Sequence, residues 1–285
     1  MEKIIVNGEM LERNGFYVDI EDRGYQFGDG IYEVIRVYEG RMYTQEEHLN
    51  RLYESAGKIG LNISYTKEEL TDHLEKLIQS NQLDTGIIYM QFTRGASPRQ
   101  HAFPVEPVPA SYVAYTKVMA RPEVFMKEGV KGHLVEDIRW LRCDIKSLNL
   151  LGNIMAKQSA SEAGCFEAIQ HRGETVTEGS SSNVFIVKEG AVITHPATNL
   201  ILNGITRQEI QKLCSESGIV FEEREFTVTN LMAADEVFIA STTSEVMPIV
   251  EIDNTVIGDG KPGQVTKQLQ TLFWNRVVER AKLAI

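Results

Sequence analysis

The stretch Glu178-Gly179-Ser180-Ser181-Ser182-Asn183-Val184-Phe185 decides how this sequence is interpreted. It places one carboxylate ahead of a turn of small residues, and the turn leads into residues that favour a strand. A second stretch, Leu202-Asn203-Gly204-Ile205-Thr206-Arg207, opens a predicted helix whose free N–H groups can hold a phosphate. A third, Ser241-Thr242-Thr243-Ser244, offers four hydroxyls to the same kind of ligand. Together they predict a phosphate-binding site in the second half of the chain.

One lysine lies upstream of these stretches. Lys146 follows Ile145 and precedes a predicted amphipathic helix that carries Leu148, Leu151 and Met155 on one face. An amine that apolar neighbours partly shield from water becomes available as a neutral nucleophile, which Schiff-base chemistry requires. Taken alone, the same pattern also fits a solvated lysine near the start of a helix.

Composition and charge narrow the class of protein. The 285 residues are 42% hydrophobic and 24% charged, which is typical of a globular protein with one large domain or two medium ones. The net charge of -11 repels nucleic acid and anionic membranes on average. We therefore expect small-molecule partners, with neither nucleic acid nor a membrane among them.

The cysteine pattern and the lack of a recognisable targeting signal indicate the cytoplasm. Cys143, Cys165 and Cys214 form no C-x-x-C pair, so we expect neither disulfides nor a zinc site, and no other metal motif occurs. Residues 1–10 lack the apolar core of a signal peptide, and no later run reaches about 18 apolar residues. We therefore expect a cytoplasmic protein without a bound metal.

Local signals divide the chain into two α+β domains, residues 1–118 and 123–285, joined by a linker at 119–122. The first domain is predicted to combine a sheet with two helices. Its elements are a hairpin around Asn7-Gly8, a strand at 31–38, helices at 45–58 and 67–80 after capping boxes at Thr44 and Thr66, and strands at 87–92 and 112–115 around a long irregular loop.

The second domain alternates predicted strands with predicted helices. The strands are 130–135, 185–187, 237–240 and 249–252, and the helices lie near 148–163, 206–217 and 264–282. Gly164 and Gly218 stand where helix C-caps belong. The elements predict a fold of the α+β class.

The order and spacing of the stretches within 178–207 resemble the class IV, fold-type IV pyridoxal-phosphate aminotransferases. Residues 22–33, DRGYQFGDGIYE, and 94–101, RGASPRQH, are similar to the D-amino-acid aminotransferase branch of that family. The resemblance implies a smaller N-terminal α/β domain and a larger C-terminal α/β pseudo-barrel that binds the cofactor. It also implies a transferase that exchanges the amino group of D-alanine, D-glutamate or similar D-amino acids with 2-oxo acids such as 2-oxoglutarate or pyruvate.

The resemblance assigns roles to particular residues. Lys146 would bind pyridoxal 5'-phosphate covalently and then act as the base at the substrate Cα. Glu178 would face the pyridine nitrogen and keep it protonated. The remaining cofactor contacts would come from Arg51, Ile205, Thr206 and Thr242 at the phosphate and from Leu202 at the ring.

A short feature in the first domain concerns the substrate. Arg99 and His101 are alternate residues of an extended loop and can offer donors to one carboxylate, and Tyr32 could add a third. In the D-specific branch, the resemblance implies, the arginine and histidine reach the site from the partner subunit. We therefore expect a homodimer whose active sites are completed in trans.

Three alternatives stay open on the sequence alone. A branched-chain L-amino-acid aminotransferase would keep Lys146 and Glu178 but bind the carboxylate elsewhere, which the Arg99-x-His101 pair argues against. An aminodeoxychorismate lyase of the same fold would eliminate pyruvate without a second oxo acid. A pyridoxal-phosphate-binding protein without turnover would not need both Lys146 and Glu178.

Overall fold

The computed structural model describes residues 2–282, which form two compact units. The first unit runs to Ala120 and also includes Ile145–Asn149, and the second comprises Arg121–Asp144 and Leu150–Lys282. The sequence division left residues 145–149 in the second half of the chain. The structure groups the segment that carries Lys146 with the first unit instead.

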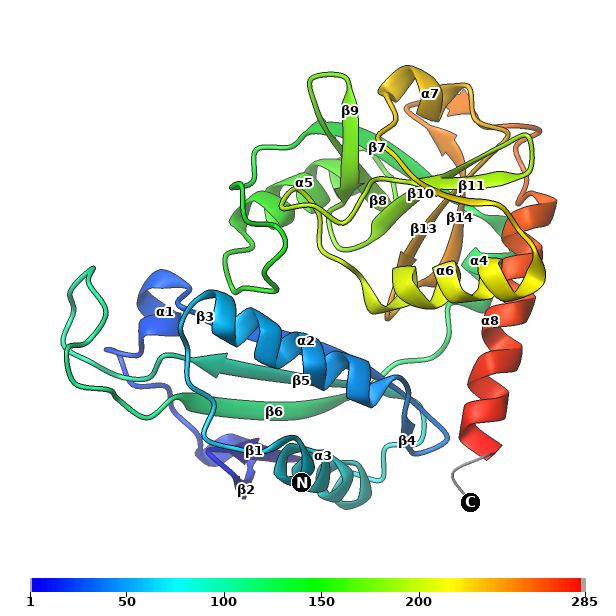
Figure 1. The fold of residues 1–285 in the computed structure, drawn as a ribbon. Helices are drawn as coiled ribbons and strands as arrows, with labels where there is room; N and C mark the ends of the chain where they lie inside the picture. The colour runs from blue at the N-terminus through cyan, green and yellow to red at the C-terminus, as the bar shows by residue number, and fades with distance from the viewer. Residues whose placement is uncertain (1, 283–285) are drawn as a thin grey trace. The chain divides into compact units, whose positions relative to one another are not determined.

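A six-stranded antiparallel sheet forms the first unit (Figure 1). Its strand order is β2-β1-β6-β5-β3-β4. The strands are β1 (Lys3–Val6), β2 (Glu9–Glu12), β3 (Gly30–Tyr38), β4 (Arg41–Met42), β5 (Gly86–Thr93) and β6 (Ser111–Val118). Helices α2 (Gln45–Lys58) and α3 (Lys67–Ser80) pack their apolar faces against alternate strand residues such as Ile35, Ile88 and Ala114. This packing forms the core of the unit, and the short helices η1 (Arg13–Gly15) and α1 (Arg23–Phe27) lie between β2 and β3 in the chain.

The alternating residues of the same strands point away from that core. Tyr32, Tyr89 and Tyr115 are half-buried, and their rings stack in a row with centroid separations of 5.6 and 5.1 Å. Helices α2 and α3 therefore cover one face of the sheet, and a row of tyrosines marks the other.

Most local predictions for the first unit are confirmed. The hairpin turns at Asn7 and Gly8, both with positive φ, and α2 and α3 occupy the predicted ranges. Thr66 forms the predicted capping box with Glu69. The capping box at Thr44 is wrong, because Thr44 is left-handed (φ 50°) and its hydroxyl donates to the Tyr43 carbonyl at 2.8 Å.

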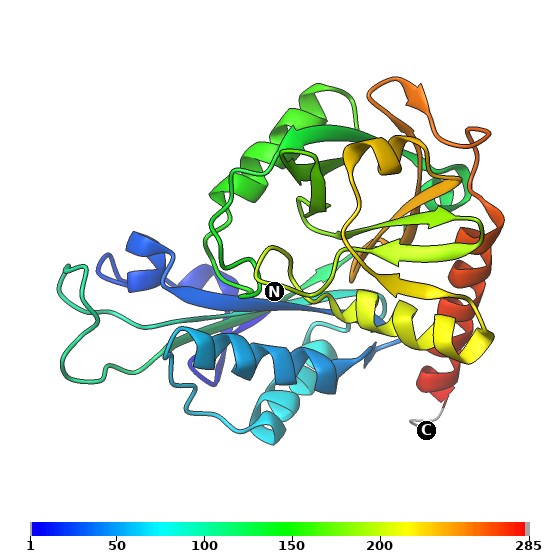
Figure 2. The ribbon, with the colours of Figure 1, turned by 45° about the horizontal axis from the view of Figure 1, so that its top comes forward.

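A nine-stranded mixed sheet forms the second unit (Figure 2). Its main path is β12-β11-β10-β13-β14-β7-β8-β9, with β15 paired to β14. The strands are β7 (Val130–Glu136), β8 (Glu167–Arg172), β9 (Thr175–Gly179), β10 (Asn183–Lys188), β11 (Ala191–Thr194), β12 (Phe221–Glu223), β13 (Glu236–Ser241), β14 (Glu245–Ile252) and β15 (Thr255–Val256). Strand β9 ends the path, yet it contacts β10 near the other end, and Gly179 N–H donates to the Ser182 carbonyl at 2.7 Å. The sheet therefore curls toward a barrel, and the predicted α+β class is confirmed.

Five helices of the second unit are α4 (Glu123–Glu128), α5 (Leu151–Glu162), α6 (Ile205–Ser217), α7 (Val228–Met232) and α8 (Gln264–Lys282). Helix α5 begins three residues later than predicted, because Leu148 N–H donates to the Gly30 carbonyl and Ser147 forms a bridge with Ile31 of β3. The predicted apolar face of this helix does not pack into a core, since Leu151 and Met155 are exposed. Gly164 and Gly218 have the positive φ of helix C-terminal residues, as predicted. Within residues 2–282, no helix is both long and apolar enough to cross a membrane.

The two threonines that precede helices provide a matched test of the caps. We expect Thr66→Ala to lower the free energy of unfolding by about 1 kcal/mol, because it removes the hydroxyl that accepts from Glu69 N–H. Thr44→Ala should change it by less than half as much through capping, since the Thr44 hydroxyl caps no helix N–H. Urea unfolding of both variants measures the difference. Equal losses would contradict the assignment.

Candidate active site

Lys146 is fastened to the edge of β3. Its carbonyl accepts from Tyr32 N–H at 3.0 Å, and its N–H donates to the Ser55 hydroxyl on α2 at 3.3 Å. The half-buried amine lies 4.2 Å from the centroid of the Tyr32 ring. Among the described residues it has no hydrogen-bond or ion-pair partner. The backbone of Lys146 is thus fixed, while its amine is available for a carbonyl ligand.

Beside this lysine, α2 and β3 bring together a buried ionic cluster that the sequence did not reveal. Arg51 donates to both carboxylate oxygens of Glu33, at 2.7 and 2.9 Å, and His48 Nδ1 lies 2.7 Å from the same carboxylate. Burial would raise the pKa of Glu33, but the charges of Arg51 and His48 hold it far below its usual range. Burial also lowers the pKa of His48, against the attraction of Glu33. Arg51 therefore stands one helical turn before Ser55 in a fixed orientation, and its role at the phosphate stays a prediction.

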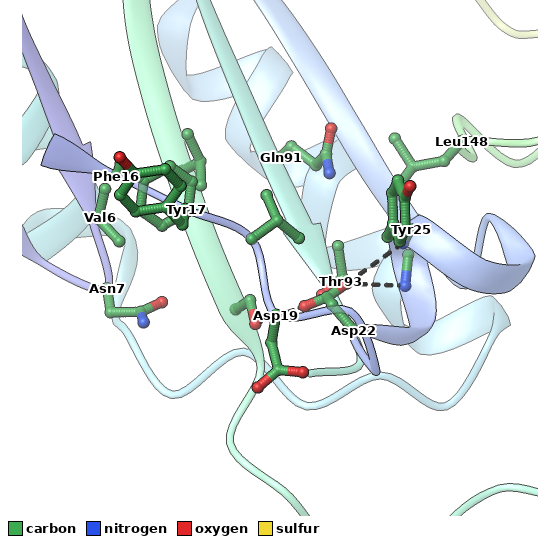
Figure 3. Close-up of a pocket in the computed structure, with 14 residues that line it drawn as sticks. Val6, Asn7, Phe16, Tyr17, Asp19, Asp22, Tyr25, Gln91, Thr93 and Leu148 are labelled. Atoms are coloured by element: carbon green, nitrogen blue, oxygen red, sulfur yellow. Dashed lines mark hydrogen bonds between the residues drawn. The ribbon is translucent and has the colours of Figure 1, made fainter. Parts of the chain in front are cut away.

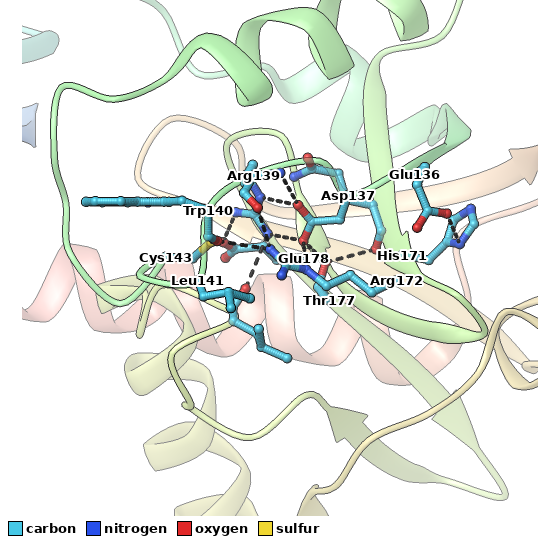
Figure 4. A network of polar contacts seen from close by, with 12 residues as sticks. Glu136, Asp137, Arg139, Trp140, Leu141, Cys143, His171, Arg172, Thr177 and Glu178 are labelled. Carbon is cyan, nitrogen blue, oxygen red and sulfur yellow. Dashed lines mark hydrogen bonds and ion pairs between the residues drawn. The ribbon is translucent and has the colours of Figure 1, made fainter. Parts of the chain in front are cut away.

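In the second unit, Glu178 belongs to a network of buried charges (Figure 4). Arg139 Nη1 donates to Glu178 Oε1 at 2.5 Å, and the same guanidinium donates through Nε and Nη2 to Asp137 at 2.9 and 2.8 Å. Asp137 also accepts from Arg172 and from the Thr177 hydroxyl. Asp137 accepts most of the hydrogen bonds in this network. Glu178 therefore has one cationic partner, Arg139, and shares it with Asp137.

The two carboxylates of this network differ in pKa. Burial would raise the pKa of Asp137, but hydrogen bonds from Arg139 and the charge of Arg139 lower it to about 2. Burial raises the pKa of Glu178 to about 7, and the opposing pull of Arg139 is insufficient to offset it. Glu178 is therefore a carboxyl group that gains or loses a proton near neutral pH.

Asn183 links Glu178 to Leu202, another predicted residue of the second unit. Its amide donates to Glu178 Oε2 at 3.1 Å and to the Leu202 carbonyl at 2.8 Å, and Leu202 N–H donates to the same carboxylate oxygen at 3.1 Å. A Cβ on Gly204 would fall 2.2 Å from Asn183 Oδ1, so only glycine fits there without moving this amide. Asn183 also pairs with Ala240, two residues before Thr242.

These residues fit the predicted cofactor. Helix α6 starts at Ile205 and Thr206 directly after Gly204, and no side chain caps its N-terminus, which leaves N–H groups for a phosphate. Thr242 and Thr243 lie in the turn after β13, where Ser244 N–H donates to the Ser241 hydroxyl. A carboxyl group for a ring nitrogen and donors for a phosphate thus occur together in the second unit. The first unit carries the Lys146 amine, which has no hydrogen-bond or ion-pair partner among the described residues.

The loop between β5 and β6 carries the two predicted carboxylate-binding residues. Arg99 and His101 are exposed. The Arg99 guanidinium lies 4.5 Å from the centroid of the Phe27 ring and donates to Gln26 Oε1 at 3.1 Å, and the His101 ring lies 5.7 Å from that of Phe27. The structure brings these side chains together on α1, and their action on a substrate stays a prediction, as does that of Tyr32.

Comparison with known proteins gives the family of this chain. The family model described as amino-transferase class IV matches residues 30–252. The chain belongs to this family.

Similar proteins extend the match over nearly the whole chain. A D-alanine aminotransferase of Staphylococcus aureus (strain MSSA476) is 53% identical over 273 residues, covering 96% of this chain and 97% of the relative. A D-alanine aminotransferase of Bacillus licheniformis is 50% identical over 281 residues, covering 98% and 99%. Among solved structures, a T.th. branched-chain amino acid aminotransferase with pyridoxamine 5'-phosphate superposes with a TM-score of 0.92 at 25% identity, over 98% of this chain and 94% of the other.

Family membership confirms several predictions. The transferase class, the two-domain fold-type IV architecture and pyridoxal 5'-phosphate as the cofactor are all confirmed. The individual site residues are not tested by these matches, and Glu33, His48, Asp137 and Arg139 were missed. Of these, Glu33 ends the stretch 22–33 on which the resemblance rests, and Arg139 stands shortly before Lys146.

The raised pKa of Glu178 predicts a pH-dependent stability of the cofactor-free protein. Below about pH 4.5 the Glu178 carboxyl is protonated in both the folded and the unfolded state, so its ionisation does not change the free energy of unfolding. As pH rises toward 7, the unfolded state ionises first, and the folded state loses stability, by up to about 3 kcal/mol. Glu178→Gln removes this loss.

Chemical denaturation at pH 5 and pH 8 measures the effect. We expect Glu178→Gln to be more stable relative to wild type at pH 8 than at pH 5. Glu162→Gln, on the exposed face of α5, should show no such change. A pH-independent difference for Glu178→Gln would mean that Arg139 keeps Glu178 ionised throughout.

Proposed function

We propose that this chain catalyses transamination between D-amino acids, D-alanine among them, and 2-oxo acids such as 2-oxoglutarate. The observation that carries the proposal is identity of 50 to 53% to D-alanine aminotransferases over nearly the whole chain. The branched-chain aminotransferase solved with pyridoxamine 5'-phosphate shares the fold at only 25% identity, so it supports the architecture more than the substrate. The Arg99-x-His101 pair agrees with the D-amino-acid branch.

The residues of the site account for the chemistry. Pyridoxal 5'-phosphate, when bound, supplies the electron sink that stabilises negative charge at the substrate Cα. Lys146 would supply the amine that holds the cofactor, and its Nζ would take and return the Cα proton beside the Tyr32 ring. Glu178 would hold the proton of the pyridine nitrogen, and its Asn183, Leu202 and Arg139 contacts fix its orientation.

We also propose that the chain forms a homodimer. Large apolar side chains are exposed close together along the second unit's chain: Ile138, Trp140, Leu141, Leu151, Ile154 and Met155. On the first unit, the wall of a pocket of about 420 Å³ includes the apolar side chains of Phe16, Tyr17, Tyr25 and Leu148 beside the polar ones of Asp22, Gln91 and Thr93 (Figure 3). Exposed apolar area of this kind is typical of subunit interfaces.

A substrate panel tests the activity directly. We expect D-alanine to yield pyruvate only when 2-oxoglutarate is present, and L-leucine to react at least about a hundredfold more slowly. Faster turnover of L-leucine would favour the branched-chain alternative. Pyruvate from 4-amino-4-deoxychorismate without 2-oxoglutarate would favour the lyase, and cofactor binding without any turnover would contradict an enzymatic role.

Mixed dimers test whether Arg99 acts in trans. Arg99→Ala should raise the KM of amino and oxo acids roughly ten- to a hundredfold, because a charge-assisted contact contributes about 1.5 to 3 kcal/mol. At substrate concentrations well below the KM of Arg99→Ala, exchange of subunits between Arg99→Ala and Lys146→Ala should restore about a quarter of wild-type activity, since half of the dimers are hybrids with one intact site each.

The control pairs Lys146→Ala with Glu178→Gln. We expect no recovery there, because both residues would come from the same chain in each site. If Arg99→Ala with Lys146→Ala also recovers nothing although hybrids form, Arg99 does not act across the dimer.

A further inference from the structure

Arg23, the first residue of α1, reaches the loop that carries Arg99 and His101. It is only 3% exposed. Its guanidinium donates to three successive backbone carbonyls, those of Gln100 at 2.7 Å, His101 at 3.4 Å and Ala102 at 3.3 Å. A buried cation thus holds the backbone of an exposed segment that begins directly after Arg99.

This guanidinium is itself fixed in place. Arg23 Nε donates to Asp29 Oδ2 at 2.8 Å, and Arg94 donates to the same carboxylate at 2.8 and 3.0 Å. Arg94 also donates to the carbonyls of Ile59 and Gly60, each at 2.8 Å. Burial would raise the pKa of Asp29, but the hydrogen bonds of Arg94 and Arg23 lower it below its usual value. Asp29 therefore stays ionised and aims the Arg23 side chain at the loop.

The last residue of α1 supports the side chains of the same loop. The Phe27 ring has the Arg23 and Arg99 guanidinium carbons 4.9 and 4.5 Å from its centroid and the His101 ring at 5.7 Å. One short helix therefore contacts both the backbone of the loop and its two functional side chains.

Further along the loop, the Phe103 ring lies with its centroid 3.7 Å from the Arg94 guanidinium carbon, but the loop backbone has few other fixed points. Within the part of the chain that the structure describes, no backbone group of residues 98–109 is hydrogen-bonded to another backbone group. An extended loop of this kind samples many conformations unless something outside it binds its carbonyls. Arg23 binds the carbonyls that lie at and beside His101, rather than those of the later, proline-containing part of the loop.

We propose that Arg23 is the positioning residue of the substrate carboxylate site: it orders residues 100–102 so that Arg99 and His101 meet the α-carboxylate already aligned. The inference rests on the proposed role of Arg99 and His101. Lysine cannot replace Arg23 here, because an ammonium lacks the planar fork that serves Asp29 and several carbonyls at once. Positioning of this kind contributes to binding by lowering the entropy that the loop loses.

Steady-state kinetics of Arg23→Lys with D-alanine and 2-oxoglutarate test the proposal. We expect KM for both substrates to rise about tenfold, with kcat and cofactor content within about twofold of wild type. Arg224→Lys, an exposed arginine paired with Glu222, is the matched control and should leave both constants unchanged. A loss of kcat and cofactor at unchanged KM is what a merely structural role would give, and it would overturn the proposal.

A double-mutant cycle separates this inference from the proposed function. In Arg99→Ala His101→Ala protein, adding Arg23→Lys should raise KM by less than about twofold, because the groups it positions are already absent. A full tenfold effect there would overturn the positioning role. If Arg99→Ala His101→Ala itself leaves KM unchanged, the carboxylate site is wrong whatever Arg23 does.

A second variant covers the case in which Arg23→Lys does not fold. Phe27→Leu keeps the hydrogen bonds of Arg23 but removes the aromatic surface beneath Arg99 and His101. We expect a KM increase of about threefold with kcat maintained. An unchanged KM in this variant would overturn the part that α1 plays in positioning the loop.

Discussion

Two backbone hydrogen bonds, from Tyr32 N–H to the Lys146 carbonyl and from Leu148 N–H to the Gly30 carbonyl, fasten residues 145–149 alongside β3. The rest of the first-unit site depends on this attachment. It takes a segment from the middle of the chain and makes it part of the N-terminal sheet, so the Lys146 amine meets the Tyr32 ring and its N–H meets Ser55. Because the Lys146 carbonyl and Leu148 N–H are bonded to β3, α5 cannot start before the segment leaves that strand.

The pKa values of two buried carboxyl groups, Glu33 and Glu178, are shifted in opposite directions. The difference follows from the number of cationic side chains that bind each carboxylate. Glu33 is bonded by Arg51 and His48, and no other carboxylate among the described residues is hydrogen-bonded to His48, so the pKa of Glu33 falls. Glu178 shares Arg139 with Asp137, whose additional donors make it the stronger competitor, so burial dominates and the pKa of Glu178 rises. The first arrangement holds an arginine in place. The second leaves a carboxyl group that can exchange a proton, which suits a position beside a ring nitrogen.

Local signals predicted a large part of the secondary structure, and the resemblance to the family predicted the candidate site residues. Helices α2 and α3 were predictable because their apolar spacing and the Thr66 cap lie within the helix sequence itself. Thr44 shows the limit of such signals, since a capping motif has no effect when the backbone turns the hydroxyl away. Lys146 and Glu178 stand in recognisable stretches. Arg23 and Glu33 stand in the stretch 22–33, but no local pattern indicates that Arg23 contacts residues 100–102 or that Asp137 contacts Arg172. Strand order and buried ionic pairs arise from long-range pairing, and no local pattern encodes them.

The distribution of charge explains why Arg99 suits a carboxylate in an acidic protein. With a net charge of -11, the chain as a whole does not attract amino or oxo acids. Its buried arginines near the predicted site are compensated: Arg51 pairs with Glu33, Arg139 with Asp137 and Arg23 with Asp29. Arg99 is different, because its neighbours are the amide of Gln26 and the ring of Phe27, and it has no carboxylate partner among the described residues. Its positive charge therefore remains available to a ligand, and the compensated Arg23 beside it can hold the loop without competing for that ligand.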